Sequence, residues 1–245
     1  MFDAKMVKDQ IVNWIEDYFR QNASLGTKAV IGISGGKDSS VVAALCAEAL
    51  GKDRTLGVLM PQGKQPDIET AYDLCKTLGI AYVEINIEGP VRALYVKIER
   101  AGLQLNSIAT FNTPARVRMT ALYAVSAIVG GRVANTCNLS EDWVGYATKF
   151  GDAAGDFSPL SNLTVAEVKA VGRELGLSPA FIDKTPIDGL CGKTDEENLG
   201  FTYMVLDQYI RENTCNDINV KEKIDRLHSI NLHKIKPMPA FKMNG

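Results

Sequence analysis

Hydrophobic residues follow two spacings along the chain up to residue 140, one typical of helices and one typical of strands. The segment 4–21 carries apolar side chains three and four residues apart, which predicts an amphipathic helix. Short apolar runs predict strands at 29–33, 55–60, 81–87 and 132–137. Helical spacing recurs between them, at 39–50, 67–78, 90–101 and 114–129.

Strands that alternate with helices in this way predict a parallel sheet with helices on both faces. We expect an α/β, doubly wound fold whose mostly parallel sheet has five strands. Ligands in such sheets bind beyond the carboxyl ends of the strands. Pro114 is expected near the first turn of its helix, where a missing N–H does no harm.

The pattern is looser beyond residue 140. Residues 143–156 predict a loop, and 185–197 predict a mobile segment with proline, glycine and several charges. Thr164 and Glu167 predict a capping box for a helix over 164–175, and helical spacing returns at 201–213 and 220–232. We expect a single domain over 1–245, with a core over about 28–180 and a helical C-terminal extension over about 181–245.

The composition is that of a soluble globular protein, with 46% hydrophobic and 23% charged residues. A net charge of −2 gives no electrostatic reason to expect a nucleic-acid partner. The chain has neither an apolar run of about 20 residues nor a signal-peptide core at its start, so we expect no membrane partner. Five cysteines without a C-x-x-C pair argue for free thiols in the cytoplasm and against zinc or iron–sulfur ligation.

The most informative motif is a small, polar loop between the first predicted strand and the next helix. Its sequence is Gly32-Ile33-Ser34-Gly35-Gly36-Lys37-Asp38-Ser39-Ser40. Glycines let the backbone approach a ligand closely, and the free N–H groups at a helix N-terminus attract an anion, so the loop predicts a phosphate site. Asp38 would repel a phosphate unless a divalent cation lay between them, and the loop therefore also implies Mg²⁺.

Two better-known phosphate loops do not fit this motif. A Walker A loop needs glycine five residues before Gly36, where this chain has Ile31, and Ser or Thr after the lysine, where it has Asp38. The dinucleotide fingerprint G-x-G-x-x-G fails because Ser34 occupies its second glycine position. A tight, capped strand–helix turn that binds no ligand is the structural alternative.

The loop resembles the SGGxDS pyrophosphate loop of the ATP pyrophosphatases, which cleave ATP between the α- and β-phosphates. Further segments occur in the order found in ammonia-dependent NAD synthetases, and the chain resembles that family over 28–236. The more specific segments are N-x-x-A-R-x-R-M at 112–119 and K-F-G-D-x-x-x-D-x-x-P-L at 149–160. The others are N-T-C-N-L-S-E at 135–141, K-T-P-x-x-G-L at 184–190, D-E at 195–196, L-G-F-T-Y at 199–203 and H-K at 233–234.

This resemblance implies an adenine nucleotide alpha hydrolase-like fold and a ligase that forms NAD from deamido-NAD, ATP and ammonia with Mg²⁺. In that family the substrate carboxylate attacks the α-phosphate, pyrophosphate leaves, and ammonia displaces AMP from the adenylate. Adenylation converts a poor leaving group into a workable one, so the protein has mainly to position reactants and neutralise charge. The resemblance also implies a homodimer, and the uncharged stretch 119–129 could bury such a surface.

The resemblance also assigns the ATP and metal contacts. Asp38 is expected to act in catalysis and to bind Mg²⁺, with Glu141 as the second metal carboxylate. Lys37 occupies the variable position of the motif, which leaves the direction of its side chain open. The expected ATP-binding residues are Gly32, Ile33, Ser34, Gly35, Gly36, Lys37, Asp38, Ser39 and Thr136.

The substrate contacts lie later in the chain. Lys149 and Asp156 belong to a glycine-rich stretch that could close over the substrate and exclude water from a hydrolysable adenylate. Arg116 and Arg118 project about 200° apart on a helix, so they cannot both face one pocket, and Arg118 is expected to be structural or to contact a second subunit. Lys149 is also expected to act in catalysis. The deamido-NAD contacts that the resemblance implies are Arg116, Lys149, Asp156, His233 and Lys234.

Two positions depart from the family pattern near ATP. A basic residue usually follows the L-T pair of the P-L-x-x-L-T-K stretch, and this chain has Val165 there. A hydroxyl residue usually follows the K-x-P segment, and this chain has Ile187. These changes raise the alternative of an inactive nucleotide-binding paralogue.

A further alternative is a tRNA-modifying ATP pyrophosphatase, for which S-G-G-K-D-S is also a typical loop. The slightly acidic net charge and the lack of paired cysteines argue against it. The expected nitrogen donor is free ammonia, because no glutaminase domain precedes the core and position 2 is Phe2 rather than cysteine. A separate glutaminase partner is left open.

Overall fold

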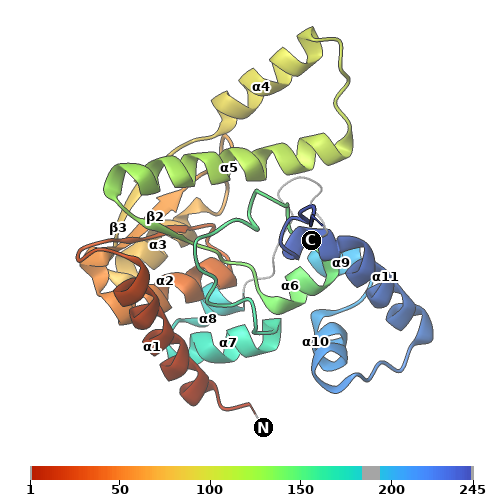
Figure 1. The fold of residues 1–245 in the computed structure, drawn as a ribbon. Helices are drawn as coiled ribbons and strands as arrows, with labels where there is room; N and C mark the ends of the chain where they lie inside the picture. Colours follow the sequence, from red (N-terminus) through yellow and green to blue (C-terminus); the bar gives the residue numbers. More distant parts are fainter. Residues whose placement is uncertain (1, 184–193, 244–245) are drawn as a thin grey trace.

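The sheet has four parallel strands among the residues that the structure describes, 2–183 and 194–243 of a computed structural model (Figure 1). The strand order is β3-β2-β1-β4, so successive strands move in one direction across the sheet up to β3 and in the other direction at β4. The carboxyl ends of β1 and β4 therefore flank the crevice where such folds bind ligands. The strands are β1 (Ala29–Gly32), β2 (Thr55–Leu59), β3 (Ala81–Glu84) and β4 (Arg132–Ala134).

The predicted doubly wound, parallel α/β fold is confirmed, but the prediction of a fifth strand is wrong for the described residues. In its place the chain at Phe157 forms a single parallel bridge beside β4. Asn135 N donates to Phe157 O and Asp156 N donates to Val133 O, both at 2.8 Å. Pro159 follows shortly afterwards and has no N–H to donate, so the pairing does not extend into a strand.

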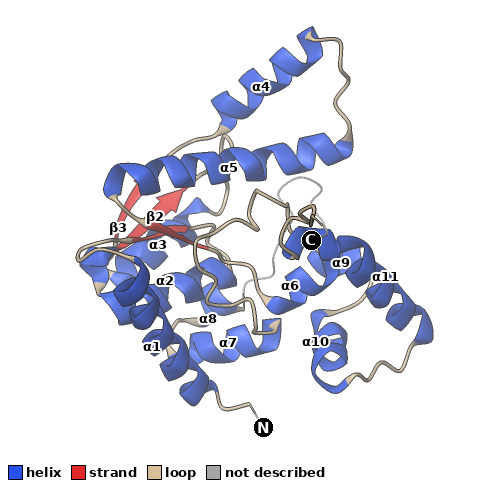
Figure 2. Cartoon of the chain, in the orientation of Figure 1, coloured by secondary structure: helices blue, strands red, loops and turns tan. Residues whose placement is uncertain are grey.

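Helices lie on both faces of the sheet (Figure 2). Alternate residues of β1 pack into two different hydrophobic clusters, as the pleat of a strand requires. Ala29 and Ile31 of β1 pack into one layer. Val30 points the other way and packs against Leu122 and Val125. The first layer contains α1 (Ala4–Asn22), α2 (Lys37–Leu50), α3 (Ile68–Leu78), α7 (Val165–Glu174) and α8 (Pro179–Ile182), and the second is α5 (Ser107–Val129).

The helices near the C-terminus form a hydrophobic cluster of their own beside the sheet (Figure 1). Leu206 and Ile224 are fully buried there, together with Val144 and Val165. A helical C-terminal extension is thus present, while the domain boundaries stay a prediction. The helices of this cluster are α6 (Leu139–Val144), α9 (Asp195–Leu199), α10 (Tyr203–Glu212) and α11 (Ile218–Ile235).

Helix α5 begins at Ser107, so the prediction of a start at Pro114 is wrong. Pro114 is buried inside the helix, and its ring nitrogen cannot donate to the carbonyl of Thr110. Tyr95 Oη of α4 (Glu88–Arg100) donates to that oxygen instead, at 3.0 Å. This bond satisfies the carbonyl and lets the helix continue, and α4 with the first half of α5 projects as a hairpin (Figure 1).

Two predicted loops are partly helical. The start of the predicted loop 143–156 belongs to α6, a helix too short to display a periodic pattern. Of the predicted mobile segment, Thr194 and Glu197 form a capping box that begins α9, whereas 184–193 lie outside the described residues. Each described helix is too short or too polar to cross a lipid bilayer.

Candidate functional site

The glycine loop joins the end of β1 to the N-terminus of α2, where a parallel sheet presents its ligand site. Ser34 Oγ accepts a hydrogen bond from Gly36 N at 3.2 Å and lies 3.1 Å from Ser39 Oγ. Ser39 Oγ also donates to Gly36 O, at 3.1 Å. Gly35 has a φ of +80°, a conformation that favours glycine. The loop is therefore held as a tight turn at a helix N-terminus, an arrangement suited to an anion.

At the start of the loop, Gly32 and Ile33 can offer a ligand only their backbone atoms. Ile33 is buried in the core and continues β1 with a hydrogen bond from its N–H to Val58 O, at 2.9 Å. Gly32 lies close to Met60, because a Cβ at position 32 would lie 3.2 Å from Met60 Cε. Thr136 is half-buried just beyond β4, at the same edge of the sheet.

The side chain of Lys37 points into the site and lies between the two acids expected to bind metal. Its Nζ lies 2.7 Å from Asp38 Oδ2 and 3.5 Å from Glu141 Oε1. The ring of Tyr203 covers the ammonium, with Nζ 5.8 Å from the ring centroid. The side chain is only 3% exposed, so Lys37 is a buried member of an ionic cluster rather than a surface lysine.

Asn138 joins the two halves of this cluster. Its Nδ2 donates to Asp38 Oδ1 at 3.0 Å, and its Oδ1 accepts from Glu141 N at 3.0 Å as the N-cap of α6. One side chain thus ties the helix that carries Glu141 to the helix that carries Asp38. Sequence reasoning missed this residue, although an asparagine directly before an acid-rich first turn is a helix N-cap signal.

Burial and like charge set the electrostatics of the cluster. Burial, together with the Asp38 carboxylate, raises the pKa of Glu141 to about 8. Burial by itself would lower the pKa of Lys37, but the attraction of Asp38 and Glu141 outweighs it and raises that pKa. Asp195 of α9 adds negative charge, and its Oδ2 accepts a hydrogen bond from Tyr203 Oη at 3.4 Å. Asp195 and Tyr203 lie in segments that carry the family resemblance, but their spacing alone predicts no role for either.

The donor set fits a magnesium ion that is shared with a nucleotide. Within 2–183 and 194–243, no group of three or more histidine, cysteine, aspartate or glutamate side chains converges as a self-sufficient metal site. Mg²⁺ commonly takes one or two carboxylates from the protein and completes its shell with water and substrate phosphates. Asp38 and Glu141 converge on one point beside a phosphate-type loop, which matches that pattern.

The residues expected to bind the second substrate form a basic group on the other side of α6. Arg116 Nε donates to Lys149 O at 3.3 Å, and Lys149 Nζ donates to His233 O. Lys234 Nζ donates to Gly145 O at 2.6 Å. The structure therefore brings together four of the five predicted residues, although both lysine ammoniums bond to backbone carbonyls here.

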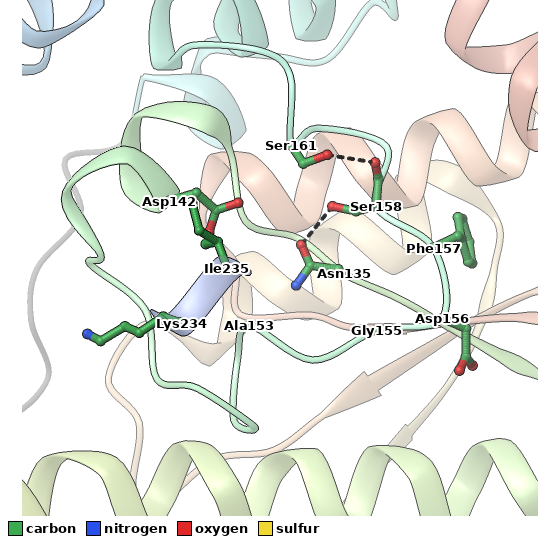
Figure 3. Close-up of a pocket in the computed structure, with 10 residues that line it drawn as sticks. All are labelled: Asn135, Asp142, Ala153, Gly155, Asp156, Phe157, Ser158, Ser161, Lys234 and Ile235. Atoms are coloured by element: carbon green, nitrogen blue, oxygen red, sulfur yellow. Dashed lines mark hydrogen bonds between the residues drawn. The ribbon is translucent and has the colours of Figure 1, made fainter. Parts of the chain in front are cut away.

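A cavity of about 400 Å³ opens beside this basic group (Figure 3). Asn135 and Ser158 form a hydrogen-bonded wall, with Ser158 Oγ donating to Asn135 Oδ1 at 2.9 Å. Gly155 is required there, because a Cβ would lie 2.6 Å from Asn135 Cβ. Asp142 and Lys234 also line the cavity, so it presents both an acid and a base to a ligand.

Asp156, the fifth predicted substrate residue, has a structural role at this position. Its Oδ2 accepts from Val133 N at 2.7 Å and its Oδ1 accepts from Tyr123 Oη at 3.3 Å. Figure 3 shows its carboxylate directed away from Asn135 and Lys234. Its expected contact with a substrate stays a prediction.

The two positions that depart from the family pattern are Val165 and Ile187. Val165 is buried in the C-terminal hydrophobic cluster with Tyr203, so an apolar contact replaces the usual charge. Ile187 lies outside the described residues. Arg118 Nε donates to Met60 O at 3.0 Å, in line with the structural role expected for it.

Comparisons with known proteins agree with this geometry. The family model for NAD synthase matches residues 7–244. The NH(3)-dependent NAD(+) synthetase of Pyrococcus furiosus is 38% identical over 226 residues, 88% of this chain and 86% of that protein. The protein of the same name from Finegoldia magna is 35% identical over 98% of this chain and 97% of its own length. These relatives do not favour a tRNA-modifying enzyme or an inactive paralogue.

Two solved structures extend the likeness to the fold. The NMN synthetase of Francisella tularensis superposes with a TM-score of 0.91 at 30% identity, over 99% of this chain and all of that one. The NH3-dependent NAD synthetase of Campylobacter jejuni gives a TM-score of 0.79 at 27% identity, with the same coverage. With the family model spanning nearly the whole sequence, the chain belongs to the NAD synthase family.

Proposed function

We propose that the chain amidates deamido-NAD with ammonia and ATP, giving NAD, AMP and pyrophosphate. The observation that carries the proposal is the convergence of Asp38 and Glu141 beside the glycine loop, with a basic group across α6. An acidic cluster next to a phosphate cradle suits a metal–triphosphate complex, and the basic group suits the phosphates of a second, anionic substrate.

The first half-reaction needs the pyrophosphate to leave. The N–H groups at the start of α2 and the hydroxyls of Ser34 and Ser39 are placed to hold its oxygens. Asp38 and Glu141 would hold Mg²⁺, which when bound offsets the charge of the phosphates. As the substrate carboxylate oxygen bonds to the α-phosphorus, the bond to the β-phosphate oxygen breaks, and an acyl adenylate forms.

In the second half-reaction, ammonia attacks the acyl carbon, AMP leaves with the bonding electron pair, and the nitrogen loses a proton. Lys149 and Lys234 would release their backbone carbonyls and neutralise substrate phosphates, with Arg116 fixing the backbone of the loop through Lys149 O. Water must be kept out, because it would attack the same carbon. We expect the glycine-rich stretch that lines the cavity to cover the adenylate.

The test is product formation by the purified chain. AMP and pyrophosphate should appear in equal amounts only when ATP, Mg²⁺, deamido-NAD and ammonium are all present. Release of AMP in the absence of deamido-NAD would contradict the proposal, and so would ATP binding without release of AMP or pyrophosphate. We also propose free ammonia as the direct nitrogen donor, which efficient turnover of the purified chain with glutamine would overturn.

A second candidate substrate is nicotinate mononucleotide. The specific observation in its favour is the TM-score of 0.91 with an NMN synthetase, against 0.79 and 0.78 with two NAD synthetases. The amidation chemistry is the same, and only the group beyond the ribose phosphate differs. The ratio of kcat/KM for the two acids, measured at saturating ATP and ammonium, decides between them.

We propose a homodimer that forms through the α4–α5 hairpin. This hairpin exposes Leu94, Leu103, Ile108 and Phe111, whereas Leu122 in the uncharged stretch of α5 packs on the sheet. Ile108→Glu should therefore lower the mass in solution from dimer to monomer. The matched control is Ile218→Glu on α11, where the wild-type side chain is similarly exposed (63% against 69%) and the mass should not change.

Localisation follows from thiol chemistry. The described cysteines, Cys46, Cys75, Cys137 and Cys215, are all free, and burial raises the pKa of Cys46 to about 12. Free thiols suit a reducing compartment. We propose that the protein works in the cytoplasm, and mass shifts with a thiol reagent after extraction under non-reducing conditions would test this.

A further inference from the structure

The ammonium of Lys37 lies at the point where a metal ion would meet its two carboxylates. Nζ is 2.7 Å from Asp38 Oδ2 and 3.5 Å from Glu141 Oε1, so one cationic group already contacts both acids. These are the distances of a charge-assisted hydrogen bond and of an ion pair. A divalent cation bound to the same two oxygens would need the space that the ammonium fills.

The surroundings keep the ammonium in that position. The Lys37 side chain is 3% exposed, and the ring of Tyr203 lies over Nζ. Asn138 fixes the free oxygen of Asp38 and the helix that carries Glu141. The acids are therefore held in place beside a lysine side chain that is almost fully buried.

Lys37 lowers the negative charge that the two acids present to a cation. Asp38 and Glu141 carry up to two negative charges, and Lys37 removes one of them without any ion from solution. The ammonium is part of the same chain and is always present at the site, so a free cation must displace it from a position of high effective concentration. A metal–nucleotide complex differs, because its phosphates offer the displaced ammonium new anionic partners.

We propose that Lys37 is a resident counter-ion that keeps a free divalent cation out of the nucleotide-free enzyme, so that the metal enters only together with the nucleotide. The inference rests on the proposed metal role of Asp38 and Glu141. It makes the loop lysine a determinant of binding order, and it gives the variable position of the loop a specific function in this chain.

The test measures Mn²⁺ binding to the nucleotide-free full chain, from the electron paramagnetic resonance signal of free Mn²⁺. Wild-type protein should bind Mn²⁺ weakly. Lys37→Met should bind it at least about tenfold more tightly, a gain of about 1.4 kcal/mol, because no ammonium then lies between the two acids. The double variant Lys37→Met with Glu141→Gln should lose that gain. Lys37→Arg, which keeps the charge, should bind as weakly as wild type.

The matched control is Lys8→Met. Lys8 also bonds to two acids, with Nζ 2.6 Å from Glu48 Oε1 and 3.0 Å from Asp9 Oδ1, but both acids are well exposed. Its loss changes the net charge by the same amount and should leave Mn²⁺ binding unchanged. An equal gain in Lys8→Met would overturn the proposal, because a non-specific charge effect would then explain the result.

Three results separate this inference from the proposed function. Tight, saturable Mn²⁺ binding by nucleotide-free wild-type protein overturns the role of Lys37 but leaves the metal site intact, and this measurement does not depend on any variant folding. No gain in Lys37→Met also overturns it. Absence of Mn²⁺ binding in wild type even with a non-hydrolysable ATP analogue would instead contradict the metal site itself.

Discussion

The two ends of helix α6 hold opposite kinds of site. At its N-terminus, Asn138 caps the helix and joins it to Asp38, within a cluster of acids around one buried lysine. At its C-terminus, Gly145 ends the helix in a left-handed conformation, beside the basic group that includes Lys149 and Lys234. A six-residue helix thus separates the proposed nucleotide half of the site from the proposed pyridine half.

The two ends differ in what holds them. The N-terminal end is bonded through side chains to the first turn of α2, at the carboxyl end of β1. The C-terminal carbonyls are bonded by one face of α11, where His228 Nδ1 lies 2.9 Å from Trp143 O and Asn231 Nδ2 donates to Val144 O at 3.1 Å. Lys234 completes this row of three, spaced three residues apart. Substrate-side geometry therefore depends on a distant helix, and nucleotide-side geometry depends on the sheet.

The largest effect should come from the N-terminal end. Glu141→Gln keeps the shape of the side chain but removes the charge expected to face the metal, and kcat/KM should fall by about 10²–10³-fold. Asp38→Asn should act similarly. Steady-state AMP release is the measurement, with Glu174→Gln, an exposed acid at the end of α7, as the control. Activity of Glu141→Gln within about twofold of wild type, below 0.5 kcal/mol, would remove the carboxylate pair from the mechanism.

The nucleotide end was also the more predictable from sequence. A strand followed by Ser34, two glycines and Asp38 specifies a turn and a helix N-terminus within a few residues, so spacing alone places these groups. The direction of Lys37 could not be read in the same way, because it depends on Glu141 and Tyr203, which are distant in sequence. The residue type at a variable position of a motif does not predict the contacts that tertiary packing gives its side chain.

The next effect tests the C-terminal end. Gly145 has a φ of +67°, and a Cβ there would lie 2.2 Å from Asn231 Cβ, which is too close for any rearrangement of a side-chain tip to relieve. Gly145→Ala should lower the free energy of unfolding by about 2–4 kcal/mol, combining backbone strain with the clash against α11. Thermal unfolding measures the loss of stability. In activity assays, the KM for deamido-NAD should rise more than the KM for ATP.

The control for that substitution is Gly130→Ala at the end of α5. Gly130 has a similar φ of +63°, but a Cβ there would meet nothing within 4 Å, so only the backbone strain of about 1–2 kcal/mol remains. Equal losses in the two variants would mean that the contact with Asn231 is unimportant. The packing of α11 against Gly145 of α6 would then contribute little to the free energy of unfolding.

Features that depend on remote partners were the ones that sequence could not supply. Helix α5 passes through Pro114 only because Tyr95, on another helix, satisfies Thr110 O. The expected fifth strand is reduced to one bridge at Phe157, since the chain turns away at Pro159. Periodicity reports local burial and cannot register either event.

A smaller effect is expected at Asn138, which links α6 to Asp38. Asn138→Ala removes the N-cap of α6 and the bond to Asp38, and should cost about 1–2 kcal/mol of stability. Asn106→Ala is the matched control, because Asn106 caps α5 in the same way, with Oδ1 accepting from Ala109 N at 2.9 Å, but lies away from the site. Asn138→Ala should lose more stability than Asn106→Ala, because Asn138 is fully buried and also bonds to Asp38, whereas Asn106 is exposed, and only Asn138→Ala should also lose kcat. Equal kcat values would reduce Asn138 to an ordinary cap.

The smallest effect concerns Asp142, near the middle of α6 and on the wall of the cavity. Burial, aided by the nearby Asp152 carboxylate, raises the pKa of Asp142 to about 6 from an ordinary 3.8. Between those two values the folded protein keeps a proton that the unfolded chain has lost, so this group lowers stability as pH rises from 3.8 towards 6. Above that range the whole penalty is present.

Asp142→Asn should therefore be more stable than wild type at pH 8 by about 1 kcal/mol, a figure reduced for partial solvent screening, and melt about 2–4 °C higher. The difference should shrink to nothing below pH 3.8, where Asp142 is protonated in both the folded and the unfolded protein. Melting curves across that range measure it, with Asp73→Asn on the exposed face of α3 as the control. A gain that is independent of pH would show that shape or packing, rather than a buried charge, limits stability at the centre of α6.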